Sequence, residues 1–264
     1  MKRIGRILMI MLVLASALLP LIANAESEPE ANPFEKPDYV YNISRENTFE
    51  NVSRELPYLE PAEFTSRLQD ASDVRIENPT LISMLNESNV KDSKVAFGVN
   101  ASIYLGSWAL SYDSEETDVN WEYERINSNT IDNRGGEDSS KLSFVQNDDK
   151  FIKGELLSPV PQQEDVQNMM RITATKKTSL PLTFLAPIGR ETKIGPEYQV
   201  HAGQMGTVQG YVPAVHDQGT VTYGEVFLTL KGKNPALVVK NIEKQQVDAW
   251  IPVKDFVTLK YNNG

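Results

Sequence analysis

Strict alternation of apolar and polar residues begins near residue 95 and is the feature that most restricts the fold. In "VAFGVNASIYL" (95–105) every odd position from Val95 to Leu105 is apolar, which is the period of a strand with one buried face. After Gly106 the apolar positions become even, starting with Trp108. A one-residue β-bulge at the glycine explains this change of parity. The sequence therefore predicts a long, half-buried strand.

The acidic stretch "DSEETD" (113–118) is predicted to be the loop of a hairpin, because alternation resumes after it at Val119. Closing the hairpin across this loop gives three cross-strand pairs on one face. These pairs are Tyr112 with Val119, Leu110 with Trp121, and Trp108 with Tyr123.

More strands are expected towards the C-terminus. Residues 169–175 are predicted to form one, and residues 198–230 a meander with turns at Gly203–Gly206 and Asp217–Gly219. The run "FVTLKY" (256–261) is predicted to be the closing strand. Strands joined by hairpins, without alternating helices, indicate a β-rich α+β fold of antiparallel hairpins and meander.

Two short helices are expected before the first strand. Pro61 fits a first helical position, with Phe64 and Leu68 four residues apart on one face, and Asn78 followed by Pro79 fits an N-cap and the first helical residue. Before them, residues 26–60 are rich in proline and carboxylates and are predicted to be an extended tether. The expected domain is a single β-rich globular unit over 61–264.

The N-terminus has the three parts of a signal peptide. Three basic residues (Lys2, Arg3 and Arg6) precede the apolar run "ILMIMLVLASALLPLIA", and "ANA" ends at Ala25. Cleavage after Ala25 predicts an exported protein, and the alternative is an uncleaved N-terminal anchor. The membrane is therefore expected as a partner only through this segment, whether transiently or as an anchor.

Charge and cysteine content exclude several classes of function. The chain has a net charge of -10, and removal of the first 25 residues takes it to -13 because they hold three basic and no acidic residues. An acidic chain without a basic stripe argues against nucleic acid as a partner. The chain has no cysteine, which excludes disulfides, thiolate nucleophiles and cysteine-based metal sites and favours a bacterial source.

The two histidines, His201 and His216, are not expected to share a metal. With a turn near Met205, His216 lies at least six residues beyond the position opposite His201, which corresponds to roughly 20 Å of strand. A zinc ion needs both ligand nitrogens within about 2.1 Å. His201 is therefore predicted to be an exposed strand residue, and His216 to flank the turn at 217–219.

A calcium site is the one metal site that the sequence suggests. Asp113, Glu115, Glu116 and Asp118 crowd the predicted hairpin loop, and calcium prefers six to eight oxygen ligands that converge from a loop. The alternative is a solvated acidic loop tip that protects the sheet edge from aggregation. No other cofactor is expected.

Catalytic motifs are absent: the sequence has no P-loop, no G-x-S-x-G, no H-E-x-x-H and no EF-hand pattern. A glycosidase would need two carboxyl groups across a cleft. Glu122 and Glu124 are conceivable members of such a pair, although an exposed sheet face explains both of them as well.

The overall length and two segments, "ENPTLISMLN" and "GQMGTVQGYVPAVHDQGTVTYGEVFLTL", resemble the YfkD-like family of uncharacterised exported proteins from Bacillus and its relatives. The resemblance covers the whole chain and implies a Gram-positive, extracytoplasmic setting. It brings no catalytic residues to this sequence.

Together these observations favour a secreted or cell-envelope protein that acts as a non-catalytic binding or structural module with a partner at the cell surface. The alternative is a cell-envelope hydrolase that uses paired carboxylates. Two carboxyl groups about 5–10 Å apart in a deep cleft would favour the hydrolase, and an apolar groove would favour the binding module.

Overall fold

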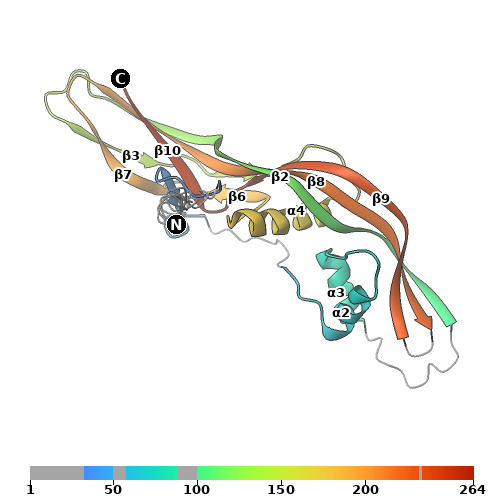
Figure 1. Ribbon diagram of the computed structural model, residues 1–264. Helices are drawn as coiled ribbons and strands as arrows, with labels where there is room; N and C mark the ends of the chain where they lie inside the picture. Colours follow the sequence, from blue (N-terminus) through green and yellow to red (C-terminus); the bar gives the residue numbers. More distant parts are fainter. Residues whose placement is uncertain (1–32, 50–57, 89–99, 232–233) are drawn as a thin grey trace, which may run out of the picture. The chain divides into compact units, whose positions relative to one another are not determined.

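The computed structural model describes residues 33–49, 58–88, 100–231 and 234–264 (Figure 1). The predicted signal peptide and the first part of the strand predicted from residue 95 lie outside these ranges. The chain divides into two compact units, Met1–Glu35 and Lys36–Gly264, and the description below concerns the second. Within the described ranges, no helix has both the length and the apolar character required to cross a membrane.

Antiparallel strands dominate the described residues, and three helices accompany them (Figure 1). The helices are α2 (Glu63–Asp70), α3 (Pro79–Glu87) and α4 (Gln163–Thr178). The strands are β1 (Val40–Asn42), β2 (Asn100–Asp132), β3 (Ser140–Val145), β4 (Lys150–Lys153), β5 (Glu155–Leu156), β6 (Leu185–Ile188), β7 (Lys193–Val200), β8 (Met205–Lys231), β9 (Asn234–Pro252) and β10 (Phe256–Asn263). The β-rich α+β class predicted from the sequence is therefore confirmed.

Strand β8 organises the main sheet. It pairs with β2 along its whole length on one side, and on the other side first with β10 and then with β9. Strands β1 and β5 extend the sheet beyond β10 and β9, while β3–β7 and β4–β6 form two separate two-stranded sheets. Every pairing between the described strands is antiparallel, because hairpin connections and long returning strands supply the partners.

Three apolar clusters hold the sheet and its covering layers together. Helix α4 packs Val166, Met169 and Met170 against the middle of β2, β8 and β9. A second cluster joins β3, β4, β6 and β7 to β8 and β10. In the third, the α2–α3 pair packs onto the other end of the three long strands, with residues that include Leu81 and Leu228.

The free edge of β2 is covered by polar contacts. Asn78 Nδ2 donates to Ala109 O (2.8 Å), the amide of Glu77 donates to Leu110 O (2.7 Å), and Gln162 Nε2 donates to Ser107 O (2.7 Å). An uncovered edge would leave these backbone groups open to pairing with another chain. Two parts of the chain, the segment between α2 and α3 and the start of α4, thus pack on the sheet. They also hydrogen-bond to backbone carbonyls along its open edge.

The predicted hairpin over 113–118 is wrong. Strand β2 runs without a turn from Asn100 to Asp132, so Tyr112 faces Val221 and Val119 faces Val215 on β8. The acidic cluster suggested a loop, but the long strand β8 pairs with this stretch, with one register shift between Ser114 and Glu116. The bulge predicted at Gly106 is confirmed, since the register shifts between Tyr104 and Gly106, where φ is 116°.

Two further local predictions are wrong. Residues 169–175 belong to helix α4 and not to a strand, because Val166, Met170 and Ala174 recur every four residues and bury one helix face. The turn predicted at Asp217–Gly219 lies inside β8. A Cβ at Gly219 would come within 2.0 Å of Asp113 O, so the glycine serves close approach of two strands and not a turn.

The segment predicted to be a tether contributes to the sheet. Strand β1 pairs with β10, and Ile43 is fully buried in the cluster around β10. Asn47 also accepts a hydrogen bond from Gly189 N (2.9 Å). The compact unit thus includes residues from Lys36 onwards, which lie before the predicted boundary at residue 61.

Candidate functional site

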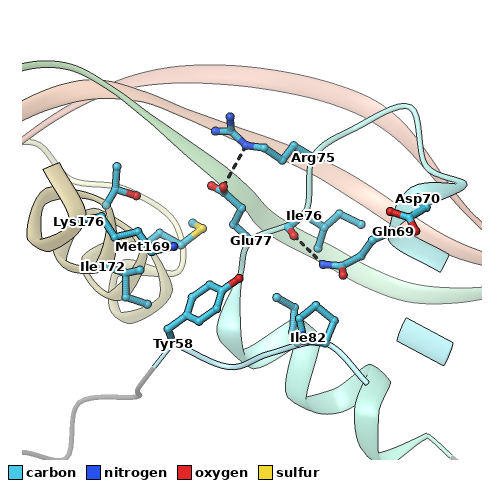
Figure 2. A pocket seen from close by; sticks show the side chains of 12 residues that line it. Tyr58, Gln69, Asp70, Arg75, Ile76, Glu77, Ile82, Met169, Ile172 and Lys176 are labelled. Carbon is cyan, nitrogen blue, oxygen red and sulfur yellow. Dashed lines mark hydrogen bonds and ion pairs between the residues drawn. The ribbon is translucent and has the colours of Figure 1, made fainter. Parts of the chain in front are cut away.

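A pocket of about 330 Å³ lies between the region of α2 and α3 and one face of α4 (Figure 2). This volume is at the small end of the ~300–1,000 Å³ typical of ligand sites. The lining combines three parts of the chain that are distant in sequence: residues 58–61, residues 69–82 and the middle of α4. Its members are Tyr58, Pro61, Gln69, Asp70, Arg75, Ile76, Glu77, Ile82, Met169, Ile172, Thr173 and Lys176.

Local hydrogen bonds fix the wall made by the segment between α2 and α3. Asn78 caps α3 by accepting from Leu81 N (3.0 Å), and Pro79 follows at the first helical turn. Gln69 Nε2, at the end of α2, donates to Ile76 O (2.8 Å), as Figure 2 shows. Because both ends of the segment are held, Arg75, Ile76 and Glu77 are set in place without a ligand.

The floor of the pocket is apolar. Ile76, Ile82 and Met169 are 5%, 4% and 2% exposed, and Ile172 on α4 is half-buried. These side chains come from the loop, from α3 and from α4. An apolar group that enters here leaves water and contacts a surface that is already packed, which favours binding by ~25 cal/mol per Å² of apolar area removed from water.

The charged side chains in the middle of the wall are held in ion pairs. Arg75 Nε lies 3.2 Å from Glu77 Oε1, and its Nη2 lies 2.6 Å from Asp113 Oδ1. Nη2 also donates to Tyr112 O (3.0 Å). Arg75 is thus held by three acceptors, and Glu77 is paired with a cation.

The two remaining charges of the lining have no such partner. Lys176 Nζ lies 4.1 Å from the centre of the Tyr58 ring, a cation–π contact, and has no carboxylate partner within the described part of the chain. The carboxylate of Asp70 has no ion pair or hydrogen bond with any residue that the structure describes. Figure 2 shows Lys176 and Asp70 on opposite sides of the pocket, with the apolar side chains between them.

The four carboxylates predicted to bind calcium lie along strand β2. Asp113 pairs with Arg75, and Glu115 Oε1 accepts from Thr220 Oγ1 (2.6 Å). Glu116 and Asp118 are exposed. In the ranges that the structure describes, no group of three or more histidine, aspartate or glutamate side chains is arranged to hold a metal ion. The calcium site stays a prediction, and the loop from which it was inferred is a continuous strand.

The two histidines occupy different environments. His201 lies in the turn before β8, exposed, with Nδ1 3.1 Å from Ser139 Oγ. His216 does not flank a turn, as the sequence suggested, but lies inside β8. Its Nε2 is 2.6 Å from Asp248 Oδ1, and its ring stacks on Trp250 at 4.4 Å. This contact follows from strand pairing, since His216 faces Trp250 across the β8–β9 ladder.

A polar cluster around Asp217 was missed by sequence reasoning. Asp217 is fully buried, and its carboxylate accepts hydrogen bonds from the hydroxyls of Tyr112 (2.7 Å), Ser114 (2.7 Å) and Thr117. Burial and the neighbouring Asp217 carboxylate raise the pKa of Tyr112 well above its usual value. None of these residues lines the pocket, and the satisfied carboxylate has the character of a stabilising core network.

The glutamates considered for a hydrolase are both exposed on β2. Glu122 Oε2 lies 2.9 Å from Lys260 Nζ, and this hydrogen bond raises the pKa of Lys260. The tryptophans pack as core residues: Trp108 and Trp121 each lie against an apolar cluster. Trp250 stacks between His216 and Tyr123.

The sequence contained a signal for only one wall of the pocket. The Asn78–Pro79 pair predicts where α3 begins, and thus the position of Glu77 beside it. The opposite wall was hidden because residues 169–175 were expected to be a strand. In a strand, Met169 and Lys176 would not share a face; in α4 they lie seven residues apart, about two turns.

Comparison with known proteins bears on the whole described unit. A family model described as YfkD-like protein matches residues 37–264. A relative from Bacillus subtilis (strain 168), "Uncharacterized protein YfkD", is 48% identical over 228 residues, which cover 86% of this chain and 86% of the relative. These matches confirm the resemblance seen in the sequence.

Among solved structures, that of lamprey immune protein has a TM-score of 0.27 with 8% sequence identity. The match covers 62% of this chain and 53% of that chain. Likeness at this level says nothing about the function of this chain.

Proposed function

The chain belongs to the YfkD-like family, and we propose that this member is an exported, non-catalytic binding module whose ligand site is the pocket between residues 58–82 and α4. The observation that carries the proposal is the preformed apolar floor enclosed by polar and charged side chains. Ligand sites are usually concave and mostly apolar, with a few polar groups that orient the ligand.

The wall charges support binding over catalysis. A general acid or nucleophile must be able to exchange a proton or attack a substrate. Glu77, which lines the pocket, is instead held by Arg75, and Arg75 is held in turn by Asp113. This arrangement stabilises the shape of the wall.

Export is proposed from the N-terminal pattern. The basic start, the apolar run and the A-x-A ending at Ala25 together fit a cleaved signal peptide. The compact unit begins at Lys36, so cleavage after Ala25 would leave this unit intact. The binding site would then act outside the cytoplasm, in the secreted or cell-envelope fraction.

The site is tested by fluorescence titration of purified 26–264 with 1-anilinonaphthalene-8-sulfonate (ANS), an apolar anion that fluoresces when removed from water. Ile172→Asn places a polar group on the pocket wall, and Ile242→Asn, on exposed β9, is the matched control. We expect the pocket variant to weaken ANS binding about tenfold and the control to match the wild type, with both melting like the parent. Equal affinity in all three proteins would contradict the proposed site.

Export is tested by expressing the full chain in Bacillus subtilis and determining its N-terminus by mass spectrometry in each cell fraction. The expected product begins at Glu26 and is found outside the cytoplasm. A product that still begins at Met1 and stays in the cytosol would refute export.

A further inference from the structure

The charged residues of the pocket indicate that its ligand carries charged groups as well as apolar ones. Arg75 pairs with both Glu77 and Asp113, so these three side chains are already engaged with one another. Lys176 and Asp70 each lack an oppositely charged partner within the described residues, and Figure 2 shows them on opposite sides of the lining. The pocket therefore offers one cation and one anion, separated by an apolar floor.

A ligand complementary to this pattern carries an anion and a cation at its two ends and apolar groups between them. A free amino acid does not fit, because its ammonium and carboxylate are attached to the same carbon atom. A fatty acid does not fit either, because it has no cation for Asp70. A short linear peptide does separate the two charges, by about 3.3 Å per extended residue.

The remaining lining agrees with a peptide. Ile82, Met169 and Ile172 can receive apolar side chains, and the hydroxyl of Thr173 on α4 adds a polar group for a backbone amide. The small volume of about 330 Å³ restricts the ligand to a few residues. A carboxylate that reaches Lys176 need not displace a salt bridge to any residue that the structure describes, since the ammonium lies over the Tyr58 ring.

Resting on the proposed function, we infer that the pocket binds a di- or tripeptide with apolar side chains and free termini, its carboxylate on Lys176 and its ammonium group on Asp70. Each terminus would form a charge-assisted hydrogen bond, which is about twice as strong as a neutral one. Lys176 and Asp70 each bind one terminus, so both termini are required for full affinity.

The test is isothermal titration of 26–264 with trileucine, N-acetyl-trileucine and trileucine amide. We expect trileucine to bind, and blocking of either end to weaken binding about tenfold. Lys176→Met should weaken trileucine by a similar factor and abolish the difference between trileucine and its amide. Asp70→Asn should likewise abolish the difference between trileucine and its acetylated form.

Matched controls lie close to each test position. Lys177→Met removes a lysine whose Nζ contacts Ser114 and not the pocket, and Asp73→Asn removes a neighbouring exposed carboxylate. Both should bind trileucine like the wild type. The blocked peptides act on the wild-type protein, so the test does not depend on the folding of any variant.

The outcomes separate the two proposals. If ANS binds and Ile172→Asn weakens it, but trileucine does not bind or binds equally well when blocked, the peptide inference is overturned and the pocket stands. If Ile172→Asn changes the affinity of neither ANS nor trileucine, both proposals fail. Cleavage of trileucine, detected by mass spectrometry after incubation, would overturn the non-catalytic assignment.

Discussion

At the scale of single residues, buried polar groups contribute more to the stability of the folded chain than exposed charges do. Asp217 is fully buried but accepts three hydroxyl hydrogen bonds, which offset the cost of taking a carboxylate out of water. The sequence placed Asp217 in a turn and the hydroxyl donors beside or within a loop. Only the β2–β8 register, which sets Thr117 opposite Asp217, brings them together.

Removal of one hydroxyl donor to Asp217 should therefore lower the free energy of unfolding. We expect Tyr112→Phe to lower the free energy of unfolding by about 1.5–3 kcal/mol, because hydrogen bonds to charged groups contribute in this range. Tyr211→Phe is the control, since its hydroxyl donates a partly buried hydrogen bond to the neutral Gln209, and should cost less than about 1 kcal/mol. Urea unfolding of both variants gives the comparison, and equal midpoints would contradict the role of the Asp217 cluster.

Alkaline pH should destabilise the protein through its half-buried tyrosines. Burial raises the pKa of Tyr198 and of Tyr223 to about 12 in the folded chain, against about 10 when unfolded. The folded state holds these protons more tightly, so the stabilisation is complete below pH 10 and is lost as the pH rises towards 12.

The measurement is the urea midpoint at intervals from pH 8 to pH 12. In Tyr223→Phe the decline above pH 10 should be shallower than in the wild type, while the value at pH 8 provides the reference for each protein. A decline of the same steepness in both proteins would show that Tyr223 does not contribute.

At the scale of elements, alternation with period two indicated strands over part of the chain, but it did not show where those strands end, and residues 169–175, expected to be a strand, lie in α4. The alternation and the parity change at Gly106 gave the first part of β2, and "FVTLKY" gave β10. Charge and glycine suggested turns at 113–118 and 217–219, which both lie in long paired strands. A partner strand about one hundred residues away satisfies these positions, and no local pattern contains that information.

The segment between α2 and α3 links the edge of β2 to the pocket wall, and Asn78 is its central residue. Asn78→Ala removes both the α3 cap and the donor to Ala109 O, and should cost about 2–4 kcal/mol. Asn78→Ser restores a cap acceptor and should recover about half of this loss. Thermal and urea unfolding measure whether stability falls in the order wild type, Asn78→Ser, Asn78→Ala. A stability of Asn78→Ala equal to that of the wild type would contradict this order.

At the scale of the whole molecule, the family and the β-rich class followed from the sequence, whereas the candidate site did not. The pocket needs α4 as one wall, and a helix with apolar residues on several faces is easily taken for a strand. The domain boundary also depends on a long-range contact: β1 is short, and only its pairing with β10 shows that it belongs to the sheet.

Ile43 tests this boundary. We expect Ile43→Ala to destabilise the protein by about 2–5 kcal/mol, because it removes a fully buried side chain from the core. Ile242→Ala, which is 51% exposed, should change stability by less than about 0.5 kcal/mol. A neutral Ile43→Ala would place residues 26–60 outside the folded unit, as the sequence had suggested.

The pocket between residues 58–82 and α4 is expected to bind the ligand. The most direct measurement is NMR chemical-shift mapping of 26–264 during titration with trileucine. We expect the perturbed amides to concentrate around residues 69–82 and 169–176. Perturbations centred instead on the far strands β3, β7 or β10, or none at saturating peptide, would contradict it.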